Sequence, residues 1–136
     1  VFNTKGEGDS ISKFKYIELF AGIGGFRTAL DRLGGECIFA SEIDKFAKQA
    51  YSLLYGDEHL HGDITNVDAE DVPDHELLTA GFPCQSFSLA GKRLGFEDTR
   101  GTLFFEVARI AQIKQPKVIL LENVKGLINH GKGKTL

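Results

Sequence analysis

The chain has 136 residues, of which 42% are hydrophobic and 26% are charged, and its formal net charge at pH 7 is −3. These fractions are ordinary for a globular protein, the length suits one domain with a modest core, and no apolar run is long enough to span a membrane. The slight negative charge excludes a binder that is basic all over but is compatible with a local cationic strip. Two cysteines make no disulfide framework, so a reducing cytosolic setting is favoured.

Extended and helical patterns alternate along the chain after an irregular lead-in over residues 1–13. Strand-forming residues predict extended segments at 14–20, 36–40, 60–65, 77–81 and 118–121. Helical spacing predicts helices at 25–33, at about 46–54 and from a cap at Thr99 to Lys114. The last extended segment is the most continuously apolar and predicts a central parallel strand. The alternation predicts the α/β class, with a parallel sheet and helices on both faces.

Apolar residues at helical spacing also predict the inward face of each helix. These residues are Phe26, Ala29, Leu30 and Leu33 in the first helix, Phe46, Ala50, Leu53 and Leu54 in the second, and Leu103, Phe104, Val107, Ala108 and Ala111 in the third. Cys37, in the middle of the second predicted strand, is interpreted as a core residue. The four histidines are scattered and lack metal-ligand spacing, so we propose no zinc site.

A glycine-rich turn, Ala21-Gly22-Ile23-Gly24-Gly25, follows the first predicted strand. Glycines at such a place allow a tight turn and the close approach of a ligand at a helix amino terminus. Glu42 lies twenty residues past Gly22, at the end of the second strand, where nucleotide-binding α/β folds use a carboxylate to accept hydrogen bonds from ribose hydroxyls. The turn lacks the third glycine of the dinucleotide fingerprint, and the alternative is a turn that serves only helix packing.

Asp63 ends the third extended segment and is expected beside Glu42 along the same edge of the sheet. A carboxylate there is suited to accept a hydrogen bond from an adenine amino group. The alternative is a helix cap or turn former, because Gly-Asp is a common turn pair.

Cys84 stands in Gly81-Phe82-Pro83-Cys84-Gln85-Ser86, directly after the fourth predicted strand. Proline fixes its own φ and favours an extended residue before it, so the thiol leaves the strand in a restricted direction. The carboxyl end of a strand in an α/β sheet is where ligands and chemistry collect, although a free cysteine is often just a small buried hydrophobe.

Glu122 ends the last apolar strand, as Cys84 follows the strand before it. If these two strands are neighbours, the side chains share one rim, where the cysteine is suited to be a nucleophile and the carboxyl a proton donor, with coupled titrations. The alternative for Glu122 is a structural carboxylate that accepts backbone N–H bonds. Residues 82–100 are predicted to form a long loop, which in compact domains is usually functional or mobile.

Five segments occur in an order that resembles the motifs of the DNA cytosine-5 methyltransferases, in particular the bacterial modification enzymes of restriction–modification systems. The segments are Phe20 to Gly25, Glu42, Gly62-Asp63-Ile64, Gly81-Phe82-Pro83-Cys84-Gln85 and Glu122-Asn123-Val124. The resemblance runs from about Phe14 to the end of the chain. It implies a Rossmann-like S-adenosylmethionine-dependent methyltransferase fold, truncated after the fifth strand. Residues 14–136 would then be the amino-terminal part of the catalytic domain, without the target-recognition domain or the carboxy-terminal segment.

The resemblance also implies a role for each matching residue. For the S-adenosylmethionine site it implies that Phe20, Ile43, Asp63 and Ile64 contact the adenine, with Ile43 beside the ring and Asp63 and Ile64 at its edge. It implies that Glu42 binds the ribose and that the methionine part passes along Ala21, Gly22, Ile23 and Gly24. The pocket near the methyl group would be lined by Gly81, Pro83 and Leu103. Ile43 stands where relatives often carry an aromatic residue, which would weaken stacking.

For catalysis the resemblance implies that Cys84 attacks C6 of a flipped cytosine in double-stranded DNA and that Glu122 protonates near N3, so that C5 takes the methyl group. The loop residues implied to contact DNA are Gln85, Ser86, Ser88, Lys92 and Arg93, with Asn123 and Arg100 in support; a solvated flexible loop is the alternative. The setting would be the bacterial cytoplasm at the nucleoid, with the missing carboxy-terminal half as a further partner and no membrane. Two rival hypotheses are an NAD-binding domain of an oxidoreductase and a non-catalytic half of a split enzyme.

Overall fold

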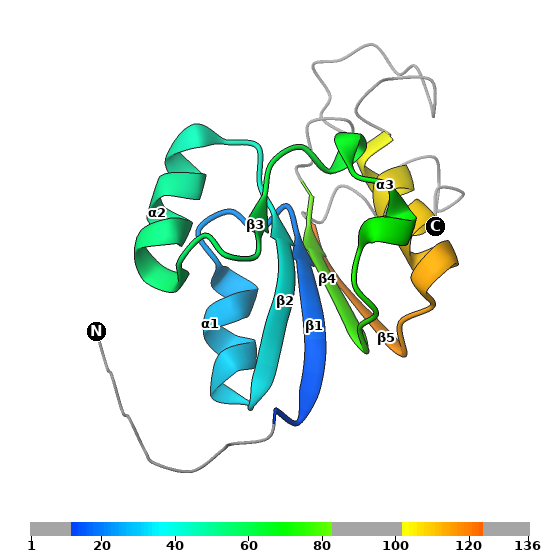
Figure 1. The fold of residues 1–136 in the computed structure, drawn as a ribbon, viewed down its shortest axis with the longest axis horizontal. Coiled ribbons are helices and arrows are strands. Elements are labelled where there is room, and N and C mark those ends of the chain that lie inside the picture. The colour runs from blue at the N-terminus through cyan, green and yellow to red at the C-terminus, as the bar shows by residue number, and fades with distance from the viewer. Residues whose placement is uncertain (1–11, 83–101, 124–136) are drawn as a thin grey trace.

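The computed structural model describes residues 12–82 and 102–123 (Figure 1). In these ranges the strands are β1 (Phe14–Leu19), β2 (Gly35–Ser41), β3 (Leu60–His61), β4 (Leu77–Gly81) and β5 (Val118–Glu122). The α-helices are α1 (Gly25–Arg32), α2 (Lys45–Tyr55) and α3 (Thr102–Lys114), and two 3-10 turns, η1 (Ile64–Asn66) and η2 (Ala69–Asp71), lie between β3 and β4. The predicted α/β class is confirmed. No helix in the described part of the chain is long and apolar enough to cross a membrane.

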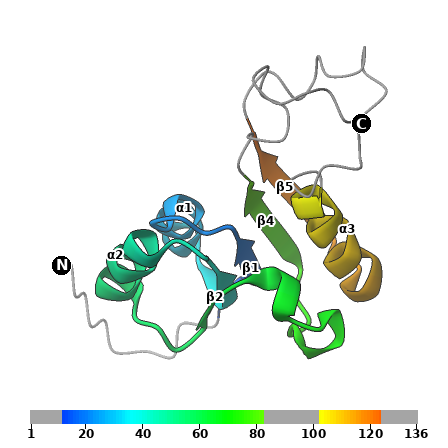
Figure 2. The same cartoon turned by 90° about the horizontal axis from the view of Figure 1, so that it is seen from above.

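The sheet has the order β3-β2-β1-β4-β5, and every neighbouring pair is parallel. The chain moves outward from β1 through β2 to β3 and then returns to place β4 on the other side of β1. The topology therefore has a switch point between β1 and β4, where ligands of open α/β sheets bind. Helices α1 and α2 lie on one face of the sheet and α3 on the other (Figure 2), which confirms the predicted layers.

The core consists of two clusters, one on each face of the sheet, because successive residues of a strand point to opposite faces. In β1, Ile17 and Leu19 belong to the cluster that packs against Val107 and Ile110 of α3, whereas Tyr16 belongs to the cluster under α1 and α2. Cys37 is 4% exposed in the second cluster, so its predicted place in the core is confirmed.

Strand β5 lies at the edge of the described sheet, whereas its continuous apolar run predicted a central strand. β4 pairs with it on one side, and Val118, Ile119, Leu120 and Leu121 are between 38% and 56% exposed. The apolar run reflects the tendency of a strand to be covered on both faces, but it carries no information on which strand lies beside it.

The predicted helix faces are partly wrong. Phe46, Leu53 and Leu54 are exposed, and α2 instead buries Tyr51. Helix α1 buries Leu30 but ends at Arg32, and Leu33 after it is exposed. Helix α3 buries Val107 and Ile110 but leaves Ala108 exposed. In α2 the reason is that the helix is anchored by an aromatic side chain with polar partners, which a count of apolar spacing does not detect.

The segment from Leu60 to Thr65 is extended only over β3 and then turns into η1. Asp63 causes this change, because its Oδ1 accepts hydrogen bonds from the Thr65 backbone N–H at 2.9 Å and from the Thr65 hydroxyl at 2.7 Å. An Asx residue that bonds to the backbone two positions later favours a turn over a strand.

Candidate active site

The carboxyl ends of the parallel strands form one rim of the sheet, defined here by Phe20 after β1, Glu42 after β2, Gly81 at the end of β4 and Glu122 at the end of β5. Most of the residues singled out from the sequence lie along this rim. Leu103 is in the first turn of α3, where it packs against the core cluster. The remaining candidates lie outside the described residues: Pro83, Cys84, Gln85, Ser86, Ser88, Lys92, Arg93 and Arg100.

The turn after β1 is held in a left-handed backbone conformation. Phe20 has φ 55°, Gly22 has φ 57° and Gly24 has φ 86°. A non-glycine residue at such a φ costs roughly 1–2 kcal/mol, and strain of this kind clusters at ligand sites. The turn is fixed by hydrogen bonds from the Ala21 N–H to the Ser41 carbonyl and from the Gly24 N–H to the Ala21 carbonyl, both 2.9 Å.

The two positive-φ glycines of the turn have different surroundings. A Cβ atom on Gly22 would meet no described heavy atom within 4 Å, whereas a Cβ atom on Gly24 would collide with the Tyr55 ring. Gly22 therefore borders open space in which a ligand can approach the backbone, and Gly24 is required by helix packing. The glycine-turn alternative, helix packing alone, accounts for Gly24 but not for Gly22.

Glu42 joins the end of β2 to this turn. Its Oε2 accepts a hydrogen bond from the Gly22 N–H at 2.7 Å, and its Oε1 accepts from the N–H groups of Ile43 at 2.9 Å and Asp44 at 2.8 Å. A carboxylate has about four acceptor positions, so three backbone bonds fix its orientation and leave capacity for a hydroxyl donor. Glu42, the residue predicted to bind the ribose, thus also links the end of β2 to the glycine turn after β1.

Asp63 and Ile64 lie after β3, beside β2 in the sheet. The capping role considered for Asp63 is realised, since its Oδ1 caps η1. The Ile64 side chain is 3% exposed in the core cluster under α3, so a ligand would contact this residue through its backbone rather than through its side chain.

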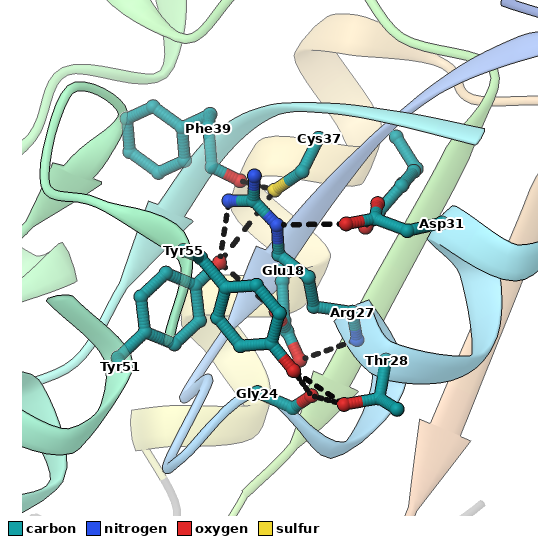
Figure 3. A network of polar contacts seen from close by, with 10 residues as sticks. Glu18, Gly24, Arg27, Thr28, Asp31, Cys37, Phe39, Tyr51 and Tyr55 are labelled. Carbon is teal, nitrogen blue, oxygen red and sulfur yellow. Dashed lines mark hydrogen bonds and ion pairs between the residues drawn. The ribbon is translucent and has the colours of Figure 1, made fainter. Parts of the chain in front are cut away.

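Glu18, which no motif in the sequence identified, is a buried carboxyl beneath the glycine turn (Figure 3). It is 1% exposed, and it accepts hydrogen bonds from the Arg27 backbone N–H at 3.4 Å and from the Tyr51 hydroxyl at 3.3 Å. Burial raises the pKa of this carboxyl to about 7, and the two hydrogen bonds oppose that rise. The sequence signal that could have identified Glu18 is an acidic residue within an otherwise apolar predicted strand.

Glu18 supplies the cap that helix α1 lacks in its own sequence. The N-cap residue Gly24 makes no side-chain cap bond, and the first turn of α1 contains no acidic residue. The Glu18 carboxyl, reaching from β1 to the Arg27 N–H in that first turn, satisfies one of the free backbone donors of the helix. The position of the glycine turn therefore depends on a residue of β1.

Arg27 and two tyrosines extend this network across α1 and α2 (Figure 3). The Arg27 guanidinium donates to the Tyr51 hydroxyl at 3.1 Å and to Asp31 at 3.3 Å, and it lies 4.9 Å from the centre of the Tyr55 ring. The Tyr55 hydroxyl donates to the Gly24 carbonyl at 3.2 Å. Helix α2 thereby contacts the glycine turn and α1 through the ring and the hydroxyl of Tyr55.

At the other end of the rim, β5 with Glu122 pairs with β4, the strand that precedes Cys84. The two strands are therefore neighbours, which is the condition under which Cys84 and Glu122 were expected to share one rim. In the parallel register Gly81 pairs with Glu122, and a Cβ atom on Gly81 would lie 3.3 Å from the Glu122 Oε2 atom. The Asn123 side chain donates a hydrogen bond to the Phe82 carbonyl at 3.0 Å. Glu122 and Asn123 thus contact the two residues that end the described part of the segment leading to Cys84.

Comparison with known proteins identifies relatives over nearly the whole chain. A family model described as C-5 cytosine-specific DNA methylase matches residues 14–136. The chain is 59% identical over 126 residues to the Type II methyltransferase M.HpaII of Haemophilus parainfluenzae, an alignment that covers 91% of this chain and 35% of the relative. It is 52% identical over 126 residues to M.HhaI of Haemophilus parahaemolyticus, covering 93% of this chain and 38% of that one.

A solved structure shares the fold. The crystal structure of the Dnmt2 methyltransferase of S. pombe matches with a TM-score of 0.69 and 29% sequence identity, covering 85% of this chain and 38% of that one. The chain thus spans a little more than a third of the length of these relatives.

Proposed function

Because the chain belongs to the C-5 cytosine-specific DNA methylase family, we propose that it carries the S-adenosylmethionine site and the nucleophile of an enzyme that methylates C5 of cytosine in DNA. The observation that carries the proposal is the shared rim. Gly22 and Glu42 follow β1 and β2 at one end, and Glu122 ends β5 at the other, so all three lie at the carboxyl ends of strands of one parallel sheet. The Type II relatives favour a modification enzyme of a restriction–modification system. We assign its setting to the bacterial cytoplasm at the nucleoid.

The residues at the rim suit S-adenosylmethionine. The open side of Gly22 admits the methionine part, and the Glu42 carboxylate accepts a ribose hydroxyl beside it. Ile43, which is 71% exposed, flanks the adenine, and the Asp63 segment meets its edge. Phe20, in the strained turn, packs on the adenine, and Gly81, Pro83 and Leu103 would complete the pocket near the methyl group. When bound, the cofactor supplies the methyl group as an electrophilic sulfonium.

The chemical step is assigned to Cys84 and Glu122. The Cys84 thiolate adds to C6 of a cytosine that has been flipped out of the duplex, because C6 is unreachable in a stacked pair. Glu122 donates a proton near N3, so that the electrons of the C5–C6 double bond become available at C5, which takes the methyl group. Loss of the C5 proton to water, with return of the N3 proton to Glu122, restores the double bond and expels the thiolate, as covalent catalysis requires.

Substrate contacts are assigned to the segment between β4 and α3. Gln85, Ser86, Ser88, Lys92 and Arg93 would contact the flipped base and the DNA phosphates, and Arg100 would brace this segment. Asn123 supports the nucleophile through its hydrogen bond to Phe82. Reading of the DNA sequence is assigned to a further carboxy-terminal part or partner chain, since the relatives are about three times as long.

The test is a chimaera in which this chain replaces the matching segment of M.HpaII, assayed for transfer of a labelled methyl group to DNA. Duplexes with 5-fluorocytosine at the target should trap a covalent adduct, because fluorine at C5 cannot leave as a cation. We expect transfer and trapping with the unmodified chain, neither with Cys84→Ser, and both with Cys37→Ala, which changes the other cysteine. Transfer that survives Cys84→Ser would contradict the assignment. In the chain alone, tight binding of NADH but not of S-adenosylhomocysteine would favour the oxidoreductase hypothesis.

A further inference from the structure

Helix α3, on the face of the sheet opposite α1 and α2, contacts the segment that follows β3. The Arg109 guanidinium donates from Nη2 to the Ile64 carbonyl oxygen at 3.2 Å. The same oxygen accepts the Val67 backbone N–H at 3.1 Å, which closes η1. Below this contact, Val107 and Ile110 of α3 pack with the Ile64 side chain in one buried cluster. One helix therefore fixes both the side chain and the carbonyl of Ile64.

The Arg109 side chain is itself oriented by a neighbour on α3. The Glu106 Oε2 atom accepts hydrogen bonds from Arg109 Nε at 2.9 Å and from Nη2 at 2.6 Å. The pair is separated by three residues, so it lies on one side of the helix, and the Glu106 side chain is only 17% exposed. Two bonds to one carboxylate fix the plane of the guanidinium, which aims Nη2 at the Ile64 carbonyl.

We propose that Arg109 is a positioning residue for adenine recognition, which acts by fixing the Asp63–Ile64 backbone from helix α3. The inference rests on the proposed function, in which this segment meets the adenine edge. Helix α3 also carries Leu103, assigned above to the pocket near the methyl group. The same helix therefore sets the adenine end of the cofactor site relative to the methyl end.

Lys114 offers a matched control on the same helix. Its Nζ donates to the Glu70 carbonyl at 2.9 Å and to Asp74 at 3.4 Å, so it also links α3 by a cation to a backbone oxygen. Its partner lies in η2, where no residue is assigned to the cofactor. Arg109→Gln and Lys114→Gln each remove one positive charge and one bond of this kind, but only the first acts on the adenine segment.

The experiment measures binding to the full chain by calorimetry with two probes, S-adenosylhomocysteine and S-inosylhomocysteine, which carries an oxo group in place of the adenine amino group. The unmodified chain is expected to prefer the adenine probe. Arg109→Gln should weaken S-adenosylhomocysteine about tenfold and reduce the preference between the probes, because loss of one charged hydrogen bond releases the segment. Lys114→Gln should change both affinities less than about twofold.

The outcomes separate this inference from the proposed function. If Arg109→Gln binds both probes as Lys114→Gln does, the positioning role is overturned while the cofactor site stands. If the unmodified chain binds neither probe, the proposed function fails and this inference fails with it. Should Arg109→Gln not fold, Arg109→Lys carries the test. Its single ammonium cannot replace the fork to Glu106 and Ile64, so a loss of about threefold in affinity is expected and an unchanged affinity would overturn the role.

Discussion

At the scale of single residues, the buried Glu18 carboxyl gives the protein a pH-dependent stability. Burial raises its pKa from an ordinary value of 4.5 to about 7 in the folded chain, so the folded state binds this proton more tightly than the unfolded state does. The stabilisation is fully present below about pH 4.5 and is lost as the pH rises through about 7. Its size is on the order of 3 kcal/mol, since each pKa unit corresponds to about 1.4 kcal/mol.

We therefore expect Glu18→Gln to gain stability relative to the unmodified chain as the pH rises from 5 to 8. The measurement is the free energy of unfolding in urea at several pH values, and Glu58→Gln, which changes an exposed carboxyl, is the control. Curves for Glu18→Gln and the unmodified chain that stay parallel over this range would show that Glu18 is not the responsible group.

The two glycines of the turn should separate stability from ligand binding. Gly24→Ala places a methyl group against the Tyr55 ring at φ 86°, so we expect a loss of roughly 3 kcal/mol of folding stability. Gly22→Ala meets no described atom and should cost about 1 kcal/mol for its φ alone, yet it should weaken S-adenosylhomocysteine binding because its methyl group enters the open side of the turn. Urea unfolding and calorimetry measure the two effects. Equal losses of stability in both variants would contradict the distinction.

Residues at the ends of strands could be predicted from the sequence, whereas residues that act through distant partners could not. Glu42 and Glu122 were identified because a carboxylate directly after a strand is visible in the sequence order. Glu18 depends on Tyr51, which is 33 residues away, and Arg109 depends on the Ile64 carbonyl, which is 45 residues away. Neither pairing can be deduced without knowing which helix covers which face.

At the scale of elements, helix α2 is anchored to the sheet by Tyr51 and not by its apolar residues. Tyr51→Phe removes a buried hydroxyl that donates to Glu18 and accepts from Arg27, so we expect a loss of about 2 kcal/mol of folding stability. Leu53→Ser changes a side chain that is 88% exposed and should alter stability by less than about 0.5 kcal/mol. Thermal and urea unfolding compare the two. A larger loss for Leu53→Ser than for Tyr51→Phe would place the anchor on the other side of the helix.

The order of the elements could be predicted well, and the rotation of each helix about its axis could not. Alternating strand formers and glycine or proline breaks gave the five strands and three helices of the described ranges. In α2 the apolar residues Phe46, Leu53 and Leu54 suggested the buried face, but the Tyr51 hydroxyl pairs with two charged groups beneath it and turns the helix toward them. Spacing measures hydrophobicity alone, whereas the fold also satisfies buried polar groups.

At the scale of the whole molecule, the parallel sheet brings segments that are distant in the sequence together into one site. The pairing of β4 with β5 was the condition on which the catalytic pair depended, and the register places Gly81 opposite Glu122. Strand ends can be recognised in a sequence, but the order of strands in the sheet cannot be read from any single segment. The connection rules of open α/β sheets limit the possible strand orders to a few, but the register between two strands is known only from the structure.

The arrangement of the rim implies that its two ends can be impaired independently. Glu42, after β2, is bonded to the backbone of Gly22, whereas Glu122, at the end of β5, lies beside Gly81. Strands β1 and β4 separate the two carboxylates, so a change in one leaves the contacts of the other intact. In the chimaera with M.HpaII, Glu122→Gln keeps the size of the side chain but removes its acid. We expect it to slow methyl transfer by about a hundredfold or more, the usual contribution of a general acid.

S-adenosylhomocysteine binding to Glu122→Gln should remain within about threefold of the unmodified chimaera, whereas Glu42→Gln should weaken binding at least as much as it slows transfer. Single-turnover rates with saturating DNA and calorimetry with S-adenosylhomocysteine measure the two quantities. If Glu122→Gln lost cofactor affinity in parallel with rate, the carboxyl at the end of β5 would belong to the cofactor site. The separation between a cofactor-binding carboxylate after β2 and a chemical carboxylate at the end of β5 would then be wrong.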